Sequence, residues 1–385
     1  MRRRQFLPVV LGLLAALAAV PSAQADSRGG ASVRLNELQV IGTHNSYHRE
    51  ISQREQAAYE AALNIPGDYD AFLAYSHATL PRQLARQNVR GLELDLFGDP
   101  QGGLYAEPLV RKRLGLGPLP DPAWREPGTK VLHSVDVDYR TTCVQLVTCL
   151  RQVRGWSEAH PDHVPIPIML ELKRSDARAV AVGGVVAPVW DRDALDALDE
   201  EIRSVFDEDE MITPDDVRRR GQTLEQSVLR HGWPKLRDSR GKVMFLLDND
   251  PGPIRDGYIA DGRRSLQGRV LFTNSREGLR DAAFIKRNEP REPNTAQIAE
   301  LVRRGYYVRT RSDVPLQTVL ANDTSMLDAA LISGAQLIST DFPQIGMSAR
   351  YDSDYVAELP DGGPARCNPV NAPRRCRSDR LEPGR

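Results

Sequence analysis

The chain has 385 residues, of which 51 are Lys or Arg and 52 are Asp or Glu, and 41% of the residues are hydrophobic. This composition is typical of a globular protein and excludes a collagen, a coiled coil or a wholly disordered chain. The balanced charge leaves no basic excess that would neutralise a phosphate backbone, so we expect no nucleic-acid partner.

Residues 1–25 have the pattern of a signal peptide. Arg2, Arg3 and Arg4 precede an apolar run at 6–20, and small residues at 23–25 provide a cleavage site. The run is too short to cross about 30 Å of hydrocarbon comfortably, which argues against a membrane anchor. Arg3 and Arg4 also fit a twin-arginine signal, so the general secretory route and the twin-arginine route both stay open. We expect a secreted monomer without a transmembrane segment.

Short apolar runs rich in Val, Ile and Leu follow from residue 38 onward, separated by segments with helical periodicity. Near-continuous apolar runs indicate strands buried on both faces, as in a parallel sheet with covering helices. The runs lie at 38–42, 91–96, 130–133, 166–172, 242–247, 270–272, 306–308 and 336–339, and 282–286 competes for the sixth place. We predict an α/β fold, a single-domain β/α (TIM) barrel of eight strands over residues 26–350.

The segment 99–129, which follows the second run, is rich in Pro and Gly and is predicted to be a long irregular loop. In a barrel, loops that follow strands lie on the catalytic face. Its apolar residues Leu114, Leu116 and Trp124 stand close to the basic stretch 111–113. Two interpretations stay open: these side chains enter a lipid interface, or they pack the loop onto the barrel.

The four cysteines form two local pairs, Cys143 with Cys149 and Cys367 with Cys376. An even count in an exported chain favours disulfides, and proximity favours these two short loops. Zinc is the alternative, but neither pair has Cys-x-x-Cys spacing. The second pair would hold an irregular C-terminal tail at 351–385.

Polar residues that can bind metals or transfer protons follow four successive predicted strands. The carboxyl ends of barrel strands converge on one mouth, so these side chains are expected to meet. A buried group of three carboxylates requires a cation, and carboxylate and amide oxygens suit Ca²⁺ better than zinc or copper. The proposed ligands are Asn45, Glu93, Asp95 and Glu171, and His44 and His133 remain for proton transfer.

Four segments carry a family resemblance: 40–47 (VIGTHNSY), 91–95 (GLELD), 132–134 (LHS) and 169–172 (MLEL). In this order they resemble the motifs of calcium-dependent phosphoinositide-specific phospholipase C, in its secreted bacterial branch. The resemblance implies a β/α barrel that cleaves phosphatidylinositol in membranes to diacylglycerol and a cyclic or acyclic inositol phosphate. It also implies that Asn45, Glu93, Asp95 and Glu171 bind Ca²⁺ and that His44 and His133 are catalytic.

For this reaction, Glu93 is the chosen acceptor of the proton from the inositol 2-hydroxyl. One histidine would stabilise the phosphorane oxygens and the other would protonate the leaving diacylglycerol oxygen, and their roles are exchangeable. Lys173 is a candidate for phosphate, against a surface ion pair of equal weight. Arg309 and Arg311 are weaker phosphate candidates, and Asp248 and Asp341 are candidates for inositol hydroxyls.

The remaining histidines have simpler interpretations. His48 and His77 are near the proposed site in sequence but are not expected to touch substrate, and His160, His163 and His231 are expected to be solvated. Two other functions stay open: a metal-dependent glycerophosphodiester or sphingolipid phosphodiesterase, and a non-catalytic protein that binds Ca²⁺ and lipid head groups. The pair His44 and His133 argues against the second, because binding alone needs no proton donor.

Overall fold

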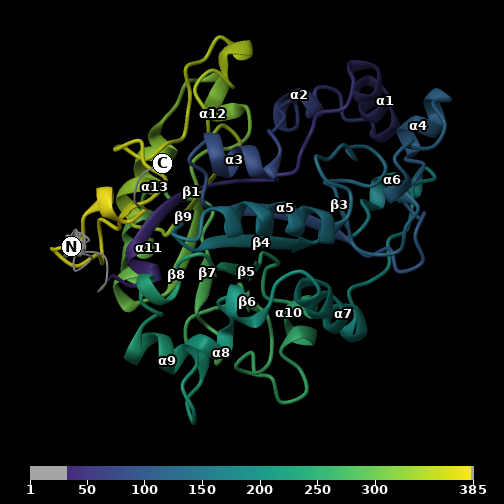
Figure 1. The fold of residues 1–385 in the computed structure, drawn as a ribbon. Helices are drawn as coiled ribbons and strands as arrows, with labels where there is room; N and C mark the ends of the chain where they lie inside the picture. The colour runs from purple at the N-terminus through teal and green to yellow at the C-terminus, as the bar shows by residue number, and fades with distance from the viewer. Residues whose placement is uncertain (1–32, 383–385) are drawn as a thin grey trace, which may run out of the picture.

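The computed structural model describes residues 33–382, so the expected signal peptide at 1–25 lies outside the described residues. Eight parallel strands form the centre of the molecule (Figure 1). They are β1 (Leu38–Thr43), β2 (Leu92–Phe97), β4 (Ile166–Leu172), β5 (Val243–Leu247), β6 (Leu271–Thr273), β7 (Phe284–Lys286), β8 (Tyr307–Arg311) and β9 (Leu337–Thr340). Nearly every residue of these strands is buried, as expected for strands covered on both faces.

The strands belong to two five-stranded sheets, ordered β10-β1-β9-β8-β7 and β3-β2-β4-β5-β6. Single parallel bridges connect the two sheets, one between Gly42 and Gly91 and one between Asn274 and Phe284. At the first of these junctions the backbones approach closely. A Cβ atom on Gly42 would lie 3.1 Å from the Gly91 backbone and 2.6 Å from Leu337 Cδ1, so a larger residue would force the strands apart.

The expected third strand at 130–133 is wrong as a barrel strand. The structure has a two-residue strand there, β3 (Lys130–Val131), and it runs antiparallel to the end of β2, with Leu96 opposite Val131. The chain leaves β2, makes the long excursion at 99–129 and returns along the same strand in the opposite direction. His133 therefore reaches the mouth from a returning loop rather than from the end of a parallel strand.

The two segments that competed for the sixth place are both strands, β6 and β7. β6 pairs with β5 and β7 pairs with β8, so the two lie on either side of the second junction between the sheets. β7 supplies the eighth parallel strand that the antiparallel β3 does not.

Helices surround the strands, and Figure 1 shows α5 lying along β4. The helix α7 buries one apolar face, Leu195, Leu198 and Ile202, against the core. None of the helices in residues 33–382 is long and apolar enough to cross a membrane. The α-helices are α1 (Gln53–Leu63), α2 (Asp68–Phe72), α3 (Leu80–Arg86), α4 (Leu109–Leu114), α5 (Leu146–Ala159), α6 (Ala177–Ala181), α7 (Arg192–Arg203), α8 (Pro214–Val217), α9 (Leu224–His231), α10 (Pro253–Tyr258), α11 (Asn294–Arg304), α12 (Gln317–Leu320) and α13 (Ser325–Ser333).

The segment 99–129 is more ordered than expected, since it contains α4 and a short 3₁₀ helix, Pro122–Trp124. Trp124 is buried in a hydrophobic cluster that also contains Leu119 and Tyr105. The packing interpretation is therefore correct for Trp124, and its entry into a lipid interface is wrong. Leu116 keeps 38% exposure.

Both predicted disulfides are present, Cys143–Cys149 and Cys367–Cys376. The C-terminal segment includes β10 (Arg366–Cys367), which pairs antiparallel with the start of β1, and a 3₁₀ helix, Ser378–Arg380. Figure 1 shows this segment beside α13 and β1, and Asn368 Nδ2 donates to Gly334 O at 2.6 Å just after α13. The second disulfide therefore closes a loop against the amino-terminal end of β1.

Candidate active site

The turn after β1 places His44 and Asn45 between the neighbouring strands. His44 N donates to Thr340 O at the end of β9, and Ser46 N donates to Glu93 O in β2. The Ser46 hydroxyl also accepts a hydrogen bond from Glu93 N at 2.8 Å. Asn45 adopts a positive φ of 45°, a conformation that Asn tolerates better than most residues. The short polar sequence after β1 thus fixes this turn to both adjacent strands.

Three carboxylates, from Glu93, Asp95 and Glu171, lie together at this mouth. One oxygen of each lies within 4.8 Å of the others. Glu93 and Asp95 are two positions apart in β2, so their side chains point to the same face of the strand. Asp95 is paired with Glu171 in the parallel register of β2 and β4. The carboxylates that the sequence grouped are therefore brought together by strand pairing.

Asp95 is the carboxylate of this cluster whose ionised form is disfavoured by burial. Its side chain is fully buried, and Oδ1 has no hydrogen-bond partner. Burial raises its pKa far above the ordinary range, Lys173 acts against this rise, and the Glu171 and Glu93 charges add to it. An orphaned carboxylate oxygen in an all-oxygen donor set fits a hard divalent cation such as Ca²⁺.

Asn45 lies in the same buried region. Its Nδ2 donates to the Tyr75 hydroxyl at 3.3 Å, and its Oδ1 accepts from the Tyr47 hydroxyl at 3.4 Å. The Asp95 charge contributes to the raised pKa of Tyr47, after burial, which indicates that Tyr47 stands close to the carboxylates. The two tyrosines thus orient the amide that the sequence assigned to the metal.

Two cations contact the carboxylates. Arg309 is almost fully buried and donates from Nη2 to Glu93 Oε2 at 2.8 Å and to Ser339 Oγ at 3.0 Å. Lys173 Nζ lies 3.0 Å from Asp95 Oδ2 and 3.3 Å from Glu171 Oε2. Both residues were candidates for phosphate, with an ion pair as an equal alternative for Lys173, and in the structure both contact acidic side chains.

His44 is held by a buried carboxylate that lies 297 positions away in the sequence. Its Nδ1 lies 3.0 Å from Asp341 Oδ1, and its Nε2 lies 3.5 Å from Glu93 Oε1. Burial and the nearby Arg311 charge lower the pKa of His44, whereas Asp341 and Glu93 oppose this shift. Because the pKa of Asp341 lies well below its usual range, the carboxylate is ionised and accepts the Nδ1 proton. Neutral His44 therefore presents an unprotonated Nε2 toward Glu93.

His133 also has a carboxylate partner. Its Nδ1 lies 3.0 Å from Asp138 Oδ2, which accepts from His48 Nε2 at 2.8 Å as well. The Tyr69 hydroxyl donates to the other Asp138 oxygen at 3.1 Å. Burial opposes ionisation of Asp138, but the two histidines keep its pKa well below the ordinary range. His48 was not expected to touch substrate, and it lies behind His133 as a buried partner of Asp138.

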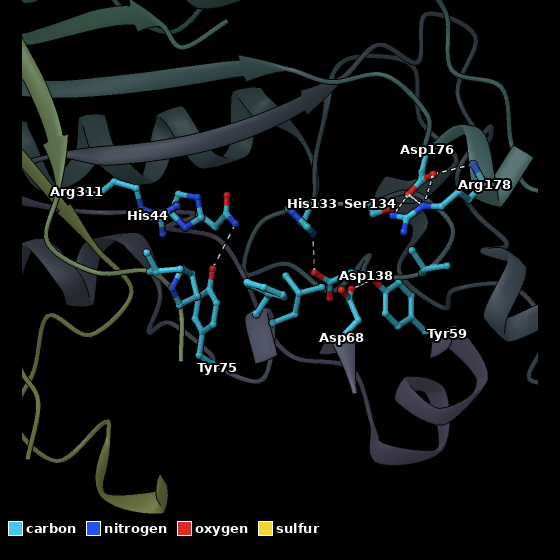
Figure 2. A pocket seen from close by; sticks show the side chains of 16 residues that line it. His44, Tyr59, Asp68, Tyr75, His133, Ser134, Asp138, Asp176, Arg178 and Arg311 are labelled. Atoms are coloured by element: carbon cyan, nitrogen blue, oxygen red, sulfur yellow. Dashed lines mark hydrogen bonds and ion pairs between the residues drawn. The ribbon is translucent and has the colours of Figure 1, made fainter. Parts of the chain in front are cut away.

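A cavity of about 390 Å³ is lined by His44, Asn45, His133 and Asp138. Figure 2 shows His44 and Arg311 at one end, His133 with Asp138 in the middle, and the Asp176–Arg178 ion pair at the other end. The two proposed catalytic histidines thus line one cavity. Arg311 pairs with Asp341 at 3.3 Å and is partly exposed beside His44, where an anionic group would meet it.

The other candidates are arranged as follows. Asp248 pairs with Lys286, a cation that the sequence analysis did not select, at 3.0 Å. His160 and His231 are exposed as expected, but solvation of His163 is wrong. His163 is buried between α5 and β4, with Ser157 Oγ 2.7 Å from Nε2 and Val164 O 2.6 Å from Nδ1.

Sequence analysis missed Asp138, Tyr75 and Lys286, and it gave Asp341 a different role. Asp138 had a local signal, since it follows His133 by only five positions in a short turn closed by the Ser134 N to Asp138 O hydrogen bond. The contact between His44 and Asp341 had no such signal, because it depends on the pairing of β1 with β9.

Comparison with known families identifies the family of this protein. Residues 33–369 match the family model for phosphoinositide phospholipase C, Ca²⁺-dependent. The chain belongs to the Ca²⁺-dependent phosphoinositide phospholipase C family. It is therefore a phosphoinositide phospholipase C, and its cofactor is Ca²⁺.

Solved structures show the same fold. A calcium-dependent phosphoinositol-specific phospholipase C from a Gram-negative Pseudomonas species matches with a TM-score of 0.53 and 16% identity, over 88% of this chain and 96% of that chain. The myo-inositol complex of the Pseudomonas enzyme matches with a TM-score of 0.52 and 16% identity, over 88% and 97% of the two chains. A comparison with curated proteins gave no match.

Proposed function

We propose that this phospholipase C cleaves phosphatidylinositol into diacylglycerol and a cyclic or acyclic inositol phosphate at the mouth described above. One observation carries the proposal: three clustered carboxylates share this mouth with two histidines that each have a buried carboxylate partner. A metal-binding protein without catalysis would need the first feature but not the second.

The metal residues in this proposal are Asn45, Glu93, Asp95 and Glu171. The carboxylate cluster and the orphaned Asp95 Oδ1 support them. When bound there, Ca²⁺ would neutralise charge on a phosphate oxygen and lower the pKa of the inositol 2-hydroxyl.

We propose that Glu93 and His44 are the groups that accept the proton of the inositol 2-hydroxyl. Arg309 binds Glu93 through Oε2, so Oε1 is the oxygen that faces His44 Nε2. The Glu93 carboxylate offers an oxygen that can accept a proton, and burial and Arg311 lower the pKa of His44, which favours an unshared electron pair on its Nε2. Asp341 positions His44 from behind.

His133 is assigned as the acid that protonates the leaving diacylglycerol oxygen. The Asp138 carboxylate lies 3.0 Å from His133 Nδ1 and orients the imidazole, much as a buried carboxylate orients the histidine in other acid–base sites. Arg311 is the phosphate ligand best placed by this cavity, and Arg309 positions Glu93. Asp248, with its partner Lys286, and Lys173 remain substrate-binding candidates.

The wider assignment follows the same evidence. We read the eight parallel strands and their two single-bridge junctions as one β/α barrel over residues 26–350, with residues 351–385 as a disulfide-held tail. The two disulfides support secretion after removal of residues 1–25, and we propose that the enzyme acts as a monomer.

Lipid contact is assigned to the segment after α6. Val182, Val186 and Val189 are exposed by 41%, 70% and 67%, which is unusual for valine. Val185 N donates to Asp136, two positions before Asp138, and Asp176 and Arg178, which precede the segment, line the cavity. The Arg113 guanidinium reaches Val182 O at 3.4 Å and places positive charge beside these valines.

The decisive experiment incubates the mature chain with phosphatidylinositol vesicles in Ca²⁺, in Mg²⁺ or in chelator, and measures inositol phosphates. Release should require Ca²⁺, and Mg²⁺ should substitute poorly because it demands a tighter octahedral site. His44→Ala and His133→Ala should each lose about 100-fold or more in kcat. Full activity in chelator, or faster cleavage of sphingomyelin or glycerophosphoinositol than of phosphatidylinositol, would contradict the proposal.

A further inference from the structure

Lys173 contacts two of the three carboxylates in the proposed calcium site. Its Nζ lies 3.0 Å from Asp95 Oδ2 and 3.3 Å from Glu171 Oε2. The residue lies just beyond the end of β4, two positions after Glu171, and its side chain is 19% exposed. One ammonium group therefore takes an oxygen from each of two neighbouring strands.

We propose that Lys173 competes with Ca²⁺ for this site: it holds Asp95 and Glu171 when the ion is absent and releases them when the ion binds. The inference rests on the proposed calcium ligands. It assigns Lys173 a function in setting the Ca²⁺ affinity, in addition to any contact with substrate.

The charges in the cluster favour displacement. Ca²⁺ requires its carboxylate ligands to be ionised, which gives Glu93, Asp95 and Glu171 three negative charges. The bound ion together with Arg309 would balance these charges. If Lys173 stayed as well, the site would carry one net positive charge, and an unbalanced charge in a buried site is costly.

Of the two cations, Lys173 is the one that can leave. Arg309 is only 2% exposed and is bound by Glu93, Asn288 and Ser339. Lys173, in contrast, borders an open cavity of about 460 Å³ that is also lined by Arg174, Asn249 and Asp250. Its flexible stem can turn into this space without disturbing the core.

Calorimetric Ca²⁺ titration of chelator-stripped protein tests the competition. Lys173→Met should bind Ca²⁺ about tenfold or more tightly than the wild type, because the competing charge is gone. Lys286→Met is the matched control. It removes a second ammonium from the same mouth, one that pairs with Asp248 at 3.0 Å rather than with the cluster, and its affinity should change far less.

Amine labelling of the unmodified wild-type chain provides a second measurement, which does not depend on the folding of a variant. Acetylation of Lys173, followed by mass spectrometry, should rise several-fold in Ca²⁺ relative to chelator, while labelling of Lys286 stays constant. Equal affinities in the wild type and Lys173→Met, with unchanged labelling, would overturn this inference and leave the calcium site standing. Failure of both proteins to bind Ca²⁺ would overturn the proposed ligands as well.

Discussion

Each proposed catalytic histidine has a carboxylate behind it, and the two carboxylates differ in their surroundings. Asp341 is shared between His44 and Arg311, so a permanent cation stands beside the first histidine. Asp138 contacts His133, His48 and the Tyr69 hydroxyl, with no guanidinium in contact among the described residues. The first arrangement favours neutral His44, which suits a base, and the second gives His133 a carboxylate partner, which suits an acid.

Asp138→Asn tests the acid assignment. Removal of the charge should leave His133 without its carboxylate partner, so kcat should fall about 10- to 100-fold while KM changes little. The pH dependence of kcat should change as well, because the group that positions the acid has lost its charge. The measurement is the pH profile of kcat for short-chain phosphatidylinositol.

Asp136→Asn is the matched control for this change. Asp136 lies in the same turn and is equally buried, but it accepts from the Leu109 and Val185 backbone amides rather than from a histidine. This variant should lose stability and keep the shape of the pH profile. Identical profiles for the two variants would contradict a role of Asp138 in proton transfer.

His163 provides a stability prediction at the same scale. Burial lowers its pKa from 6.5 to about 4. Because the folded pKa lies below the unfolded value, the neutral form stabilises the fold above about pH 6.5, and this contribution of about 3 kcal/mol disappears as pH falls toward 4. His163→Gln should therefore lose less stability than the wild type between pH 7 and pH 4 in urea unfolding. The exposed His231→Gln should follow the wild-type curve, and a His163→Gln curve parallel to it would contradict this account.

At the scale of elements, sequence patterns predicted strands better than they predicted directions. Near-continuous apolar runs predicted the positions of β1, β2, β4, β5, β8 and β9. Most of the predicted strand ends lie within one or two residues of the observed ends. The antiparallel direction of the strand at 130–133 was not predicted, because a two-residue strand carries no periodicity. Its pairing with β2 depends on how the segment 99–129 packs.

The same limit applies to the candidate site. The grouping of Glu93, Asp95 and Glu171 was predictable because they lie on the expected strands β2 and β4, whose carboxyl ends share one mouth, and Asn45 was expected beside them because it follows β1. The partners of these groups were not predictable, because they depend on side-chain directions in the folded chain. Arg309 and Glu93 are 216 positions apart, so nothing local indicates that the guanidinium contacts a carboxylate.

Removal of the Cys143–Cys149 disulfide tests whether this cross-link positions the catalytic groups of the site. It connects the start of α5 to the chain that follows the His133 turn, and both cysteines are buried. Loop-closure entropy for so short a loop gives a loss of about 2 kcal/mol when both are changed to Ser. The melting temperature should fall and kcat should persist, because Ser134 and Asp138 close the turn through their own backbone bonds.

The double variant Cys367→Ser/Cys376→Ser is the control, since that disulfide lies at the opposite, amino-terminal end of β1. Both double variants should lose similar stability and retain activity below their melting temperatures. A selective loss of kcat in the Cys143/Cys149 variant would show that the disulfide positions His133.

On the scale of the whole molecule, exposed apolar side chains gather in segments that follow the carboxyl ends of strands. The segment after β4 contributes Val186 and Val189, the segment after β8 contributes Leu320, and the segment after β9 contributes Ile345, each exposed by 60% or more. A water-soluble substrate would give no reason for such exposure on the catalytic face. Phosphatidylinositol in a bilayer does, because the enzyme must approach a surface with its mouth toward the lipid.

Val186→Ser/Val189→Ser tests this orientation by comparing two forms of one substrate. Cleavage of vesicle-borne phosphatidylinositol should fall about tenfold or more, because each valine that no longer enters the interface removes roughly 1 to 2 kcal/mol of binding. Cleavage of a short-chain monomeric substrate should stay near the wild-type rate, since neither valine lines the cavity. Ile332→Ser is the control: Ile332 is 68% exposed, but it lies at the end of α13 that leads into the start of β9, at the opposite end of the strands from the mouth. Equal losses on vesicles and monomers, or the same vesicle defect in Ile332→Ser, would mean that the exposed valines do not direct the mouth to the membrane.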